Sequence, residues 1–372
     1  MRKIRLLFVL TSPDRGGVEE VVLALLRRLD PDEFRLALAA PRPLLDAFGP
    51  DLTGLPIDTE DVAVENPLHL RELTRLSRVM RRVRPDVVNA HLFRATALAA
   101  PLGRWHGARV VETYHGREGW RRAERAGTFL PDRLVARFVH HVIAVSDAAR
   151  RFLIEGKGYP AGKISVIPNG RDLSVFQPGT GRAAVRRELA LDEPVPLVGV
   201  VGRLEPQKGH AYLLEAWPSV LREFPRARLL LAGDGTLRAA LQAQARALGT
   251  GESVIFAGFR PDVPRLLDAV DLLCLPSLYE GMPLTAIEAG AMARPVVATA
   301  VDGTPEVVVD GETGRLVPPA SPAPLAAALL DLLRDPAGAR RMGRAARERA
   351  LERFDLGRQV EETARVYRRL AA

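Results

Sequence analysis

The chain has 372 residues, of which 47% are hydrophobic and 26% charged, and its formal net charge is +8. This length is too great for one ordinary core and fits two domains of about 100–200 residues each. The composition excludes a disordered chain, a fibre and a disulfide-rich module, since the only cysteine is Cys274. We expect Cys274, which lies in an apolar stretch, to be a buried structural thiol.

The positive charge is weak support for nucleic-acid binding. Lysine occurs only at four positions (3, 157, 163 and 208), so the other 49 of the 53 basic residues are arginine. Coding bias produces such an imbalance without selection for phosphate binding. Aromatic residues make up 5% of the chain, too few for base-stacking platforms. We therefore expect no nucleic-acid partner.

Neither a membrane span nor a signal peptide is expected. No window approaches the roughly 18 consecutive apolar residues of a spanning helix. The basic start, Met1-Arg-Lys-Ile-Arg5, is followed by an apolar run too short for a signal peptide. The sequence thus predicts a cytosolic protein.

Short apolar runs alternate with longer amphipathic segments in the first half of the chain, the pattern of βαβ units on a parallel sheet. The predicted strands are Ile4–Leu10, Arg35–Ala40, Asp86–Ala90, Arg109–Thr113, His141–Val145 and Ile164–Ile167. Predicted helices include one from Gly17, one over Arg71–Arg84, and one that begins after an N-cap at Ser146 and ends near Glu155.

A polar stretch after Pro168-Asn-Gly170 indicates a linker. A second alternating series follows, with predicted strands at Leu197–Val201, Arg228–Ala232, Ser253–Phe256, Leu272–Leu275, Pro295–Ala298 and Leu316-Val317. The tail from Pro322 reads as helical, and a helix over Ala345–Leu370 is long enough to return to the first domain.

This pattern predicts an α/β fold of two doubly wound, Rossmann-like parallel-sheet domains. We expect residues 1–175 to form the first domain and residues 176–355 the second, with the helix of residues 356–372 packing back on the first. Open α/β sheets bind ligands at the carboxyl ends of their strands, so we expect the site in a cleft between the domains.

Each predicted domain has a glycine-containing turn after its first strand. In the first, Gly16 and Gly17 allow backbone N–H groups to approach a phosphate or a sugar, although an ordinary turn explains them equally well. In the second, Gly202-Arg-Leu-Glu-Pro-Gln-Lys-Gly209 carries Arg203 and Lys208. Two cations on one turn would bind a diphosphate and stabilise its departure.

The motif Glu280-Gly-Met-Pro-Leu-Thr-Ala-Ile-Glu288 follows a predicted strand, and Pro283 suits a first helical residue. A carboxylate at Glu280 can accept sugar hydroxyl hydrogens, while the backbone at the helix start points toward any phosphate above it. Glu288, inside the helix, can accept from both hydroxyls of a ribose. A helix-dipole role explains Glu280 but not Glu288.

Together, these motifs resemble the retaining glycosyltransferases of the two-Rossmann (GT-B) type, the family 4 or group 1 enzymes, over the whole chain. Further motifs in register are Thr113-Tyr-His-Gly116, Ile167-Pro-Asn-Gly170, Gly233-Asp-Gly235, Gly258-Phe before Asp262, and Gly303-Thr-Pro-Glu306.

The resemblance implies a UDP- or GDP-sugar donor, bound mainly by the second domain, and no cofactor. It assigns Arg203 and Lys208 to the diphosphate, Glu280 to donor-sugar hydroxyls and Glu288 to the ribose. His115 corresponds to a histidine near the anomeric carbon. The other implied donor-binding residues are Gly16, Gly17, Asn169, Gly233, Gly235, Gly281, Met282, Pro283, Leu284 and Thr285.

Two positions depart from the family pattern. Asn89-Ala-His91 stands where members often read His-x-His, which leaves His91 as the acceptor-side candidate. Asp302 stands where a glycine commonly precedes Gly303, a change expected to alter the diphosphate or sugar pocket near Glu306.

We expect same-face transfer of a hexose-type sugar, in which the acceptor hydroxyl enters beside the leaving diphosphate and that diphosphate takes its proton. The only Asp-x-Asp, Asp30-Pro-Asp32, lies between a helix and a strand and indicates a helix end, so no metal is expected. The alternatives are another GT-B sugar-nucleotide enzyme, such as an epimerase, and a sugar-nucleotide-binding protein without turnover.

The acceptor is expected to be a hydroxyl compound bound around Arg42–Phe48 and Gly116–Phe129, a segment that contains Arg117. Arg117 and the arginines at 71, 75, 78, 81 and 82 would meet anionic head groups if the acceptor is lipid-linked and the protein peripheral at the inner face of the membrane. A solvated helix face in an arginine-rich chain explains them equally well, and a cell-envelope glycan remains the other acceptor class.

Overall fold

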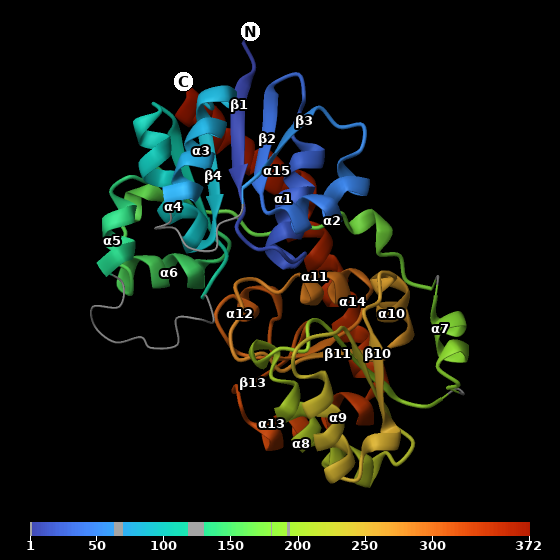
Figure 1. The fold of residues 1–372 in the computed structure, drawn as a ribbon. Coiled ribbons are helices and arrows are strands. Elements are labelled where there is room, and N and C mark those ends of the chain that lie inside the picture. Colours follow the sequence, from blue (N-terminus) through green and yellow to red (C-terminus); the bar gives the residue numbers. More distant parts are fainter. Residues whose placement is uncertain (1, 63–69, 118–129, 180, 192–193) are drawn as a thin grey trace. The chain divides into compact units, whose positions relative to one another are not determined.

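The computed structural model describes residues 2–62, 70–117, 130–179, 181–191 and 194–372, which form two compact units (Figure 1). Unit 1 comprises residues 1–170 and 356–372, and unit 2 comprises residues 171–355. The domain boundary drawn from the sequence, at 175/176, falls directly after the short 3-10 turn η2 (Leu173–Val175) of unit 2.

Unit 1 is built on a seven-stranded parallel sheet with the order β3-β2-β1-β4-β5-β6-β7. Its strands are β1 (Ile4–Val9), β2 (Phe34–Ala40), β3 (Ile57–Asp61), β4 (Val87–His91), β5 (Arg109–Tyr114), β6 (His141–Ala144) and β7 (Ile164–Val166). Its helices are α1 (Gly17–Arg28), α2 (Arg42–Leu52), α3 (Leu70–Val83), α4 (Leu92–Trp105), α5 (Leu130–Ala136), α6 (Asp147–Glu155) and α15 (Leu356–Ala371), with the 3-10 turn η1 (Ala161–Lys163).

Strand β3 was not among the strands predicted from the sequence. Its sequence, Ile57-Asp-Thr-Glu-Asp61, is mostly polar and partly or fully exposed, because β3 is an edge strand that pairs only with β2. Edge strands need little apolar alternation. The N-cap of α6 is confirmed, since Ser146 Oγ accepts a hydrogen bond of 3.1 Å from the Ala149 backbone N–H.

Unit 2 is built on a six-stranded parallel sheet with the order β10-β9-β8-β11-β12-β13. Its strands are β8 (Leu197–Val201), β9 (Arg228–Ala232), β10 (Val254–Gly258), β11 (Leu272–Leu275), β12 (Val296–Thr299) and β13 (Gly314–Val317). Its helices are α7 (Arg182–Glu188), α8 (His210–Glu223), α9 (Arg238–Ala247), α10 (Val263–Ala269), α11 (Leu284–Ala291), α12 (Thr304–Val307), α13 (Pro322–Arg334) and α14 (Pro336–Arg353), with the 3-10 turns η3 (Pro206–Lys208) and η4 (Gly251–Ser253).

The single helix expected over Ala345–Leu370 is in fact two helices, α14 and α15, which Phe354 and Asp355 separate. The Phe354 ring is buried, and its carbonyl accepts a 2.9 Å hydrogen bond from the Arg171 backbone N–H. Helix α15 groups with unit 1 and packs on α1 and β4, where Tyr367 is fully buried. Helix α14 therefore ends where Phe354 makes these tertiary contacts, which the helical pattern of the sequence does not predict.

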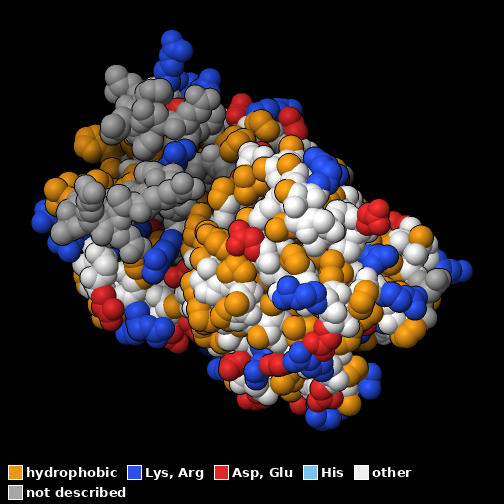
Figure 2. Space-filling view, turned by 90° about the horizontal axis from the view of Figure 1, so that it is seen from below, with side chains coloured by type: hydrophobic (Ala, Val, Ile, Leu, Met, Phe, Trp, Pro, Cys, Tyr) orange, Lys and Arg blue, Asp and Glu red, His pale blue; other side chains and the backbone are white. Residues whose placement is uncertain are grey.

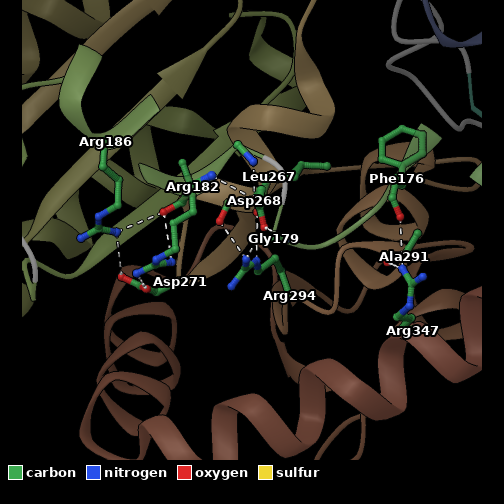
Figure 3. Close-up of polar contacts among 12 residues, drawn as sticks. Phe176, Gly179, Arg182, Arg186, Leu267, Asp268, Asp271, Ala291, Arg294 and Arg347 are labelled. Atoms are coloured by element: carbon green, nitrogen blue, oxygen red, sulfur yellow. Dashed lines mark hydrogen bonds and ion pairs between the residues drawn. The ribbon is translucent and has the colours of Figure 1, made fainter. Parts of the chain in front are cut away.

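Many arginines have structural partners. In Figure 3, Asp268 accepts hydrogen bonds from the backbone N–H of Gly179 (2.9 Å) and from Arg294 (2.8 Å), while Arg182 binds Asp271 at 2.8 Å. The backbone N–H of Gly181 also donates to Asp268, at 2.7 Å. Burial alone would raise the pKa of Asp268, but these hydrogen bonds hold it below its usual value. On the face drawn in Figure 2, basic and acidic side chains are interspersed rather than gathered in one cationic field.

Cys274 is buried as expected, and burial raises the pKa of its thiol. Among the helices of the described segments, none combines the length and the apolar character that crossing a bilayer requires.

Candidate functional site

Loops that follow β8, β9 and β11 meet at the carboxyl edge of the unit 2 sheet, and glycines make their close approach possible. Gly209 has a φ of 63° and Gly233 one of 150°. A Cβ at Gly209 would collide with the Pro276 carbonyl, and one at Gly233 with the Gly202 carbonyl. These positions therefore require glycine, because other residues rarely adopt such φ values and would not fit.

Lys208 and Glu280, which are far apart in the sequence, meet at this edge. The Lys208 Nζ lies 2.5 Å from Glu280 Oε1, and the Ser277 hydroxyl donates to the same oxygen at 2.7 Å. Glu280 as a whole is only 6% exposed. Burying a carboxylate is costly unless it is hydrogen-bonded and paired, and Lys208 and Ser277 provide these partners. The backbone N–H of Leu278 donates to the Gln207 carbonyl at 2.7 Å and ties the two loops together.

Arg203 lies on the same turn as Lys208 and is exposed. Its backbone carbonyl accepts a 2.9 Å hydrogen bond from the Glu205 N–H, but its guanidinium forms no hydrogen bond or ion pair with a described residue. The neighbouring Glu205 instead accepts from the backbone and the hydroxyl of Thr236 at 2.9 and 2.7 Å, and the backbone bond is the main cause of its lowered pKa. The Arg203 guanidinium is thus available to an anionic ligand.

Glu288, on α11, is buried and forms an ion pair with Arg171, whose Nε lies 2.7 Å from Glu288 Oε1. Sequence reasoning missed Arg171, and its only signal was its place directly after Pro168-Asn-Gly170. Pro283, which we expected to be the first helical residue, is instead the N-cap of α11. Residues 281–283 connect Glu280 to this helix, whose first residues are Leu284 and Thr285, and Met282 is buried.

Asp302 reaches into the same edge from the loop after β12. Its Oδ2 accepts a 3.0 Å hydrogen bond from the backbone N–H of Glu280, and its φ is 42°, in the left-handed region. A glycine would adopt this conformation without strain. The departure from the family pattern therefore adds a carboxylate that accepts a hydrogen bond from the Glu280 N–H.

In unit 1, His91 at the end of β4 and His115 just after β5 lie together. His91 Nδ1 is 2.8 Å from His115 Nε2, and the ring centroids are 5.1 Å apart. His91 is fully buried and His115 is partly exposed. Burial lowers the pKa of His115 to about 3 and that of His91 well below its usual value, so both rings are neutral near neutral pH.

Asn89, which replaces the first histidine of the His-x-His pattern, connects α15 to the sheet. Its Nδ2 donates to the Tyr367 hydroxyl at 2.6 Å, and its Oδ1 accepts from the Thr113 hydroxyl at 3.0 Å. The amide is buried and both of its polar atoms are bonded, so Asn89 is a structural residue here.

Other predicted ligands of unit 1 are already engaged within the protein. The N–H of Gly16, the N-cap of α1, donates to the Glu19 carboxylate at 3.0 Å, and Gly17 is the first residue of this helix. Asn169 is 4% exposed and contacts Gln359 of α15 at 3.4 Å. Gln359 also accepts a 2.8 Å hydrogen bond from the backbone N–H of Gly170.

The acceptor-side prediction is only partly covered by the structure. The Arg117 guanidinium stacks over the Phe152 ring, 5.2 Å from its centroid. Residues 118–129 lie outside the described residues. The five arginines of α3, at positions 71, 75, 78, 81 and 82, are exposed.

Comparisons with known proteins show similarity to glycosyltransferases over most of the chain. The family described as "Glycosyl transferases group 1" matches residues 181–349, and "Glycosyltransferase Family 4" matches residues 15–175. A D-inositol 3-phosphate glycosyltransferase of Kineococcus radiotolerans is 38% identical over 268 residues, which cover 66% of this chain but only 61% of that protein. A GDP-mannose-dependent alpha-(1-6)-phosphatidylinositol monomannoside mannosyltransferase of Mycolicibacterium smegmatis is 33% identical over 77% of this chain and 78% of its own length.

Among solved structures, HepE of Anabaena in complex with UDP-glucose superposes with a TM-score of 0.85 at 23% identity, over 98% of this chain and 100% of that one. The two parallel-sheet units are thus those of a GT-B fold. The chain belongs to the group 1 glycosyltransferases.

Proposed function

We propose that this protein transfers a hexose-type sugar from a nucleotide-diphosphate-sugar donor to a hydroxyl acceptor, with retention at the anomeric carbon. The observation that carries the proposal is the meeting of Lys208 with the Glu280 carboxylate, 2.5 Å apart and beside the exposed Arg203. A sugar nucleotide combines an anionic diphosphate with hydroxyl groups, and this edge offers cations for the first and a carboxylate for the second.

The chemistry proposed for the diphosphate is charge stabilisation. Arg203 and Lys208 would hold the two phosphates and stabilise the negative charge that develops as the glycosidic bond to the diphosphate breaks. Glu280 would accept from donor-sugar hydroxyls, and Glu288 would accept from the ribose. The GDP-mannose and UDP-glucose named for the relative and the solved structure support a donor of this class.

A covalent intermediate is not part of the proposal. Glu280 is bonded to Lys208 and Ser277, and Glu288 is paired with Arg171, so each carboxylate already has a binding or structural role. We infer same-face attack, in which the acceptor oxygen bonds to the anomeric carbon, the bond to the diphosphate breaks, and a diphosphate oxygen takes the acceptor proton.

We also propose that transfer needs no divalent metal. Asp30 Oδ1 accepts from the Asp32 backbone N–H at 2.8 Å, a turn contact between α1 and β2. The described residues contain no cluster of three or more His, Cys, Asp or Glu side chains suited to a metal. Arg203 and Lys208 would supply the positive charge that a metal supplies elsewhere.

The acceptor proposed is a lipid-linked hydroxyl compound at an anionic membrane surface. The relative's printed acceptor, a phosphatidylinositol monomannoside, and the exposed arginines of α3 support it. Sedimentation with vesicles of phosphatidylglycerol and phosphatidylcholine should show binding that falls with salt. Equal binding to pure phosphatidylcholine would overturn the membrane part and leave a glycan acceptor.

The donor proposal is tested with the full chain and a panel of UDP-, GDP- and ADP-sugars in EDTA. Release of the nucleoside diphosphate from at least one donor is expected, and NMR of the product should show an unchanged anomeric configuration. Tight donor binding without any turnover across acceptors would favour a non-catalytic binding protein, and a rearranged free nucleotide sugar would favour an epimerase.

A further inference from the structure

The imidazoles of His91 and His115 are joined by one hydrogen bond, in which either ring can be the donor. The donor–acceptor distance of 2.8 Å between His91 Nδ1 and His115 Nε2 is that of a normal hydrogen bond. A neutral imidazole carries one N–H and one lone pair. Either His91 Nδ1–H donates to His115 Nε2, or His115 Nε2–H donates to His91 Nδ1, and the choice decides what His115 offers to a ligand.

The other ring nitrogen of His91 favours the first arrangement. His91 Nε2 is buried and has no hydrogen-bond partner among the described residues. The ring lies against Phe8, with centroids 6.1 Å apart. In the second arrangement this nitrogen would carry a buried, unpaired N–H, whereas in the first it is a bare lone pair. Orphaned buried N–H donors are the rarer and costlier defect.

Backbone geometry holds His91 in place. His91 is the last residue of β4, which pairs in register with β5 so that His91 lies opposite Thr113. The next residue, Leu92, starts α4 with a φ of 71°, an unfavourable conformation for leucine. Such strain persists only where the surrounding structure enforces it, so the backbone that carries His91 is held by the sheet and the turn.

We propose that His91 is a positioning residue that holds His115 in its Nδ1–H form, by donating its own Nδ1–H to His115 Nε2. The role of His115 toward a sugar nucleotide rests on the proposed function, whereas the proton arrangement does not. With Nε2 occupied, His115 has no basic nitrogen left for a substrate and presents a single N–H.

This arrangement assigns a chemical role to His115. It can donate a hydrogen bond to a sugar hydroxyl or to an oxygen of the leaving group, but it cannot remove the acceptor's proton. A proton acceptor other than His115 is then required, in agreement with a diphosphate oxygen in the proposed same-face reaction. The His91 side chain therefore decides between a donor and a base without touching the substrate.

The proton positions are measurable without substrate. The full chain contains seven histidines, so selective ¹⁵N labelling and long-range ¹H–¹⁵N spectra resolve their tautomers, with His115 and His91 assigned from single variants. The expected result is protonated Nδ1 and bare Nε2 in both rings. A protonated His115 Nε2 in the unaltered protein would overturn the proposal.

Two nearly isosteric variants separate positioning from packing. His91→Asn retains an N–H donor at about the place of Nδ1, whereas His91→Asp offers only acceptors at neutral pH. The Asp variant should shift the proton to His115 Nε2 and lower kcat roughly 100-fold with a small change in KM. The kcat of the Asn variant should be at least about tenfold higher than that of the Asp variant. Equal losses in both, with an unchanged His115 spectrum, would mean that His91 only fills space.

Failure of the proposed function is distinguishable from failure of this inference. A protein that transfers no sugar but shows the Nδ1–H form of His115 refutes the first and keeps the second. Transfer activity together with a protonated His115 Nε2 does the reverse.

Discussion

The Lys208 ammonium lies 2.5 Å from Glu280 Oε1, on loops that follow the neighbouring strands β8 and β11. Lys208 is 21% exposed as a side chain and Glu280 only 8%, so the lysine is the member of the pair that solvent and ligands reach first. Under the proposed function, the pair joins a cation for the diphosphate to a carboxylate for the sugar hydroxyls.

Replacing Lys208 with Met should lower turnover by about 10²–10³-fold, because the variant loses a cation aimed at the charge on the departing diphosphate. The control is Lys3→Met in unit 1, which should retain activity, because the Lys3 side chain is 51% exposed and its ammonium lies 3.8 Å from Asp32. Steady-state kinetics with the best donor measure both. Near-normal turnover in Lys208→Met would remove this lysine from the mechanism.

Replacing Asp302 with Gly should change donor selectivity more than stability. The variant loses the 3.0 Å bond to the Glu280 N–H but gains about 1–2 kcal/mol from relief of the left-handed backbone, so the two effects nearly cancel. The freed N–H should favour donors with an additional anionic or acceptor group. Urea denaturation and kcat/KM across the donor panel test this, with Asp302→Asn as the control that keeps shape without charge. Identical selectivity in all three proteins would contradict it.

Removing Arg171 should destabilise unit 2 by roughly 2–4 kcal/mol, since the Glu288 carboxylate would remain buried without its 2.7 Å cation. Chemical denaturation of Arg171→Met measures the loss. The double variant Arg171→Met/Glu288→Gln should recover a large part of it, because the buried charge is then absent as well. An additive double variant would show that the pair is not coupled.

The buried pair of Lys157 with Asp132 in unit 1 should be costly to break. The two charges are 2.8 Å apart with side chains 3% and 0% exposed, and the ammonium lies 4.6 Å from the Tyr114 ring centroid. Lys157→Met should cost about 3–5 kcal/mol of unfolding free energy. Adding Asp132→Asn should return part of this, and a thermal melt within error of the parent protein would disprove the pairing.

Stability should fall as the pH drops from about 6.5 toward 4. Burial lowers the pKa of His115 to about 3 and that of His210 to about 4, below the value of about 6.5 in an unfolded chain. As the pH falls, these histidines bind protons in the unfolded state before they do so in the folded state, so the full stability is present above about pH 6.5. Below that pH, each such histidine lowers the free energy of unfolding by up to about 1.4 kcal/mol per pH unit. Urea unfolding at several pH values measures the slope, and His210→Asn should reduce it. A flat profile over this range would contradict the burial of neutral histidines.

Most of the sheet architecture could be predicted because buried parallel strands read as continuous apolar runs between amphipathic helices. The polar edge strand Ile57–Asp61 could not, because an edge needs few apolar residues. The break between α14 and α15 was also missed, since burial of Phe354 and its bond to Arg171, not a helix-breaking sequence, end the first helix there.

The sequence by itself determined the class of fold, the family, and which residue types stand after which strands. Only the tertiary structure decided their pairings: Lys208 with Glu280, Arg171 with Glu288, Asp302 with the Glu280 amide, and His91 with His115. The physical reason is that apolar periodicity is local along the chain, whereas the partner of a charge or a proton depends on which strand ends are neighbours in the sheet.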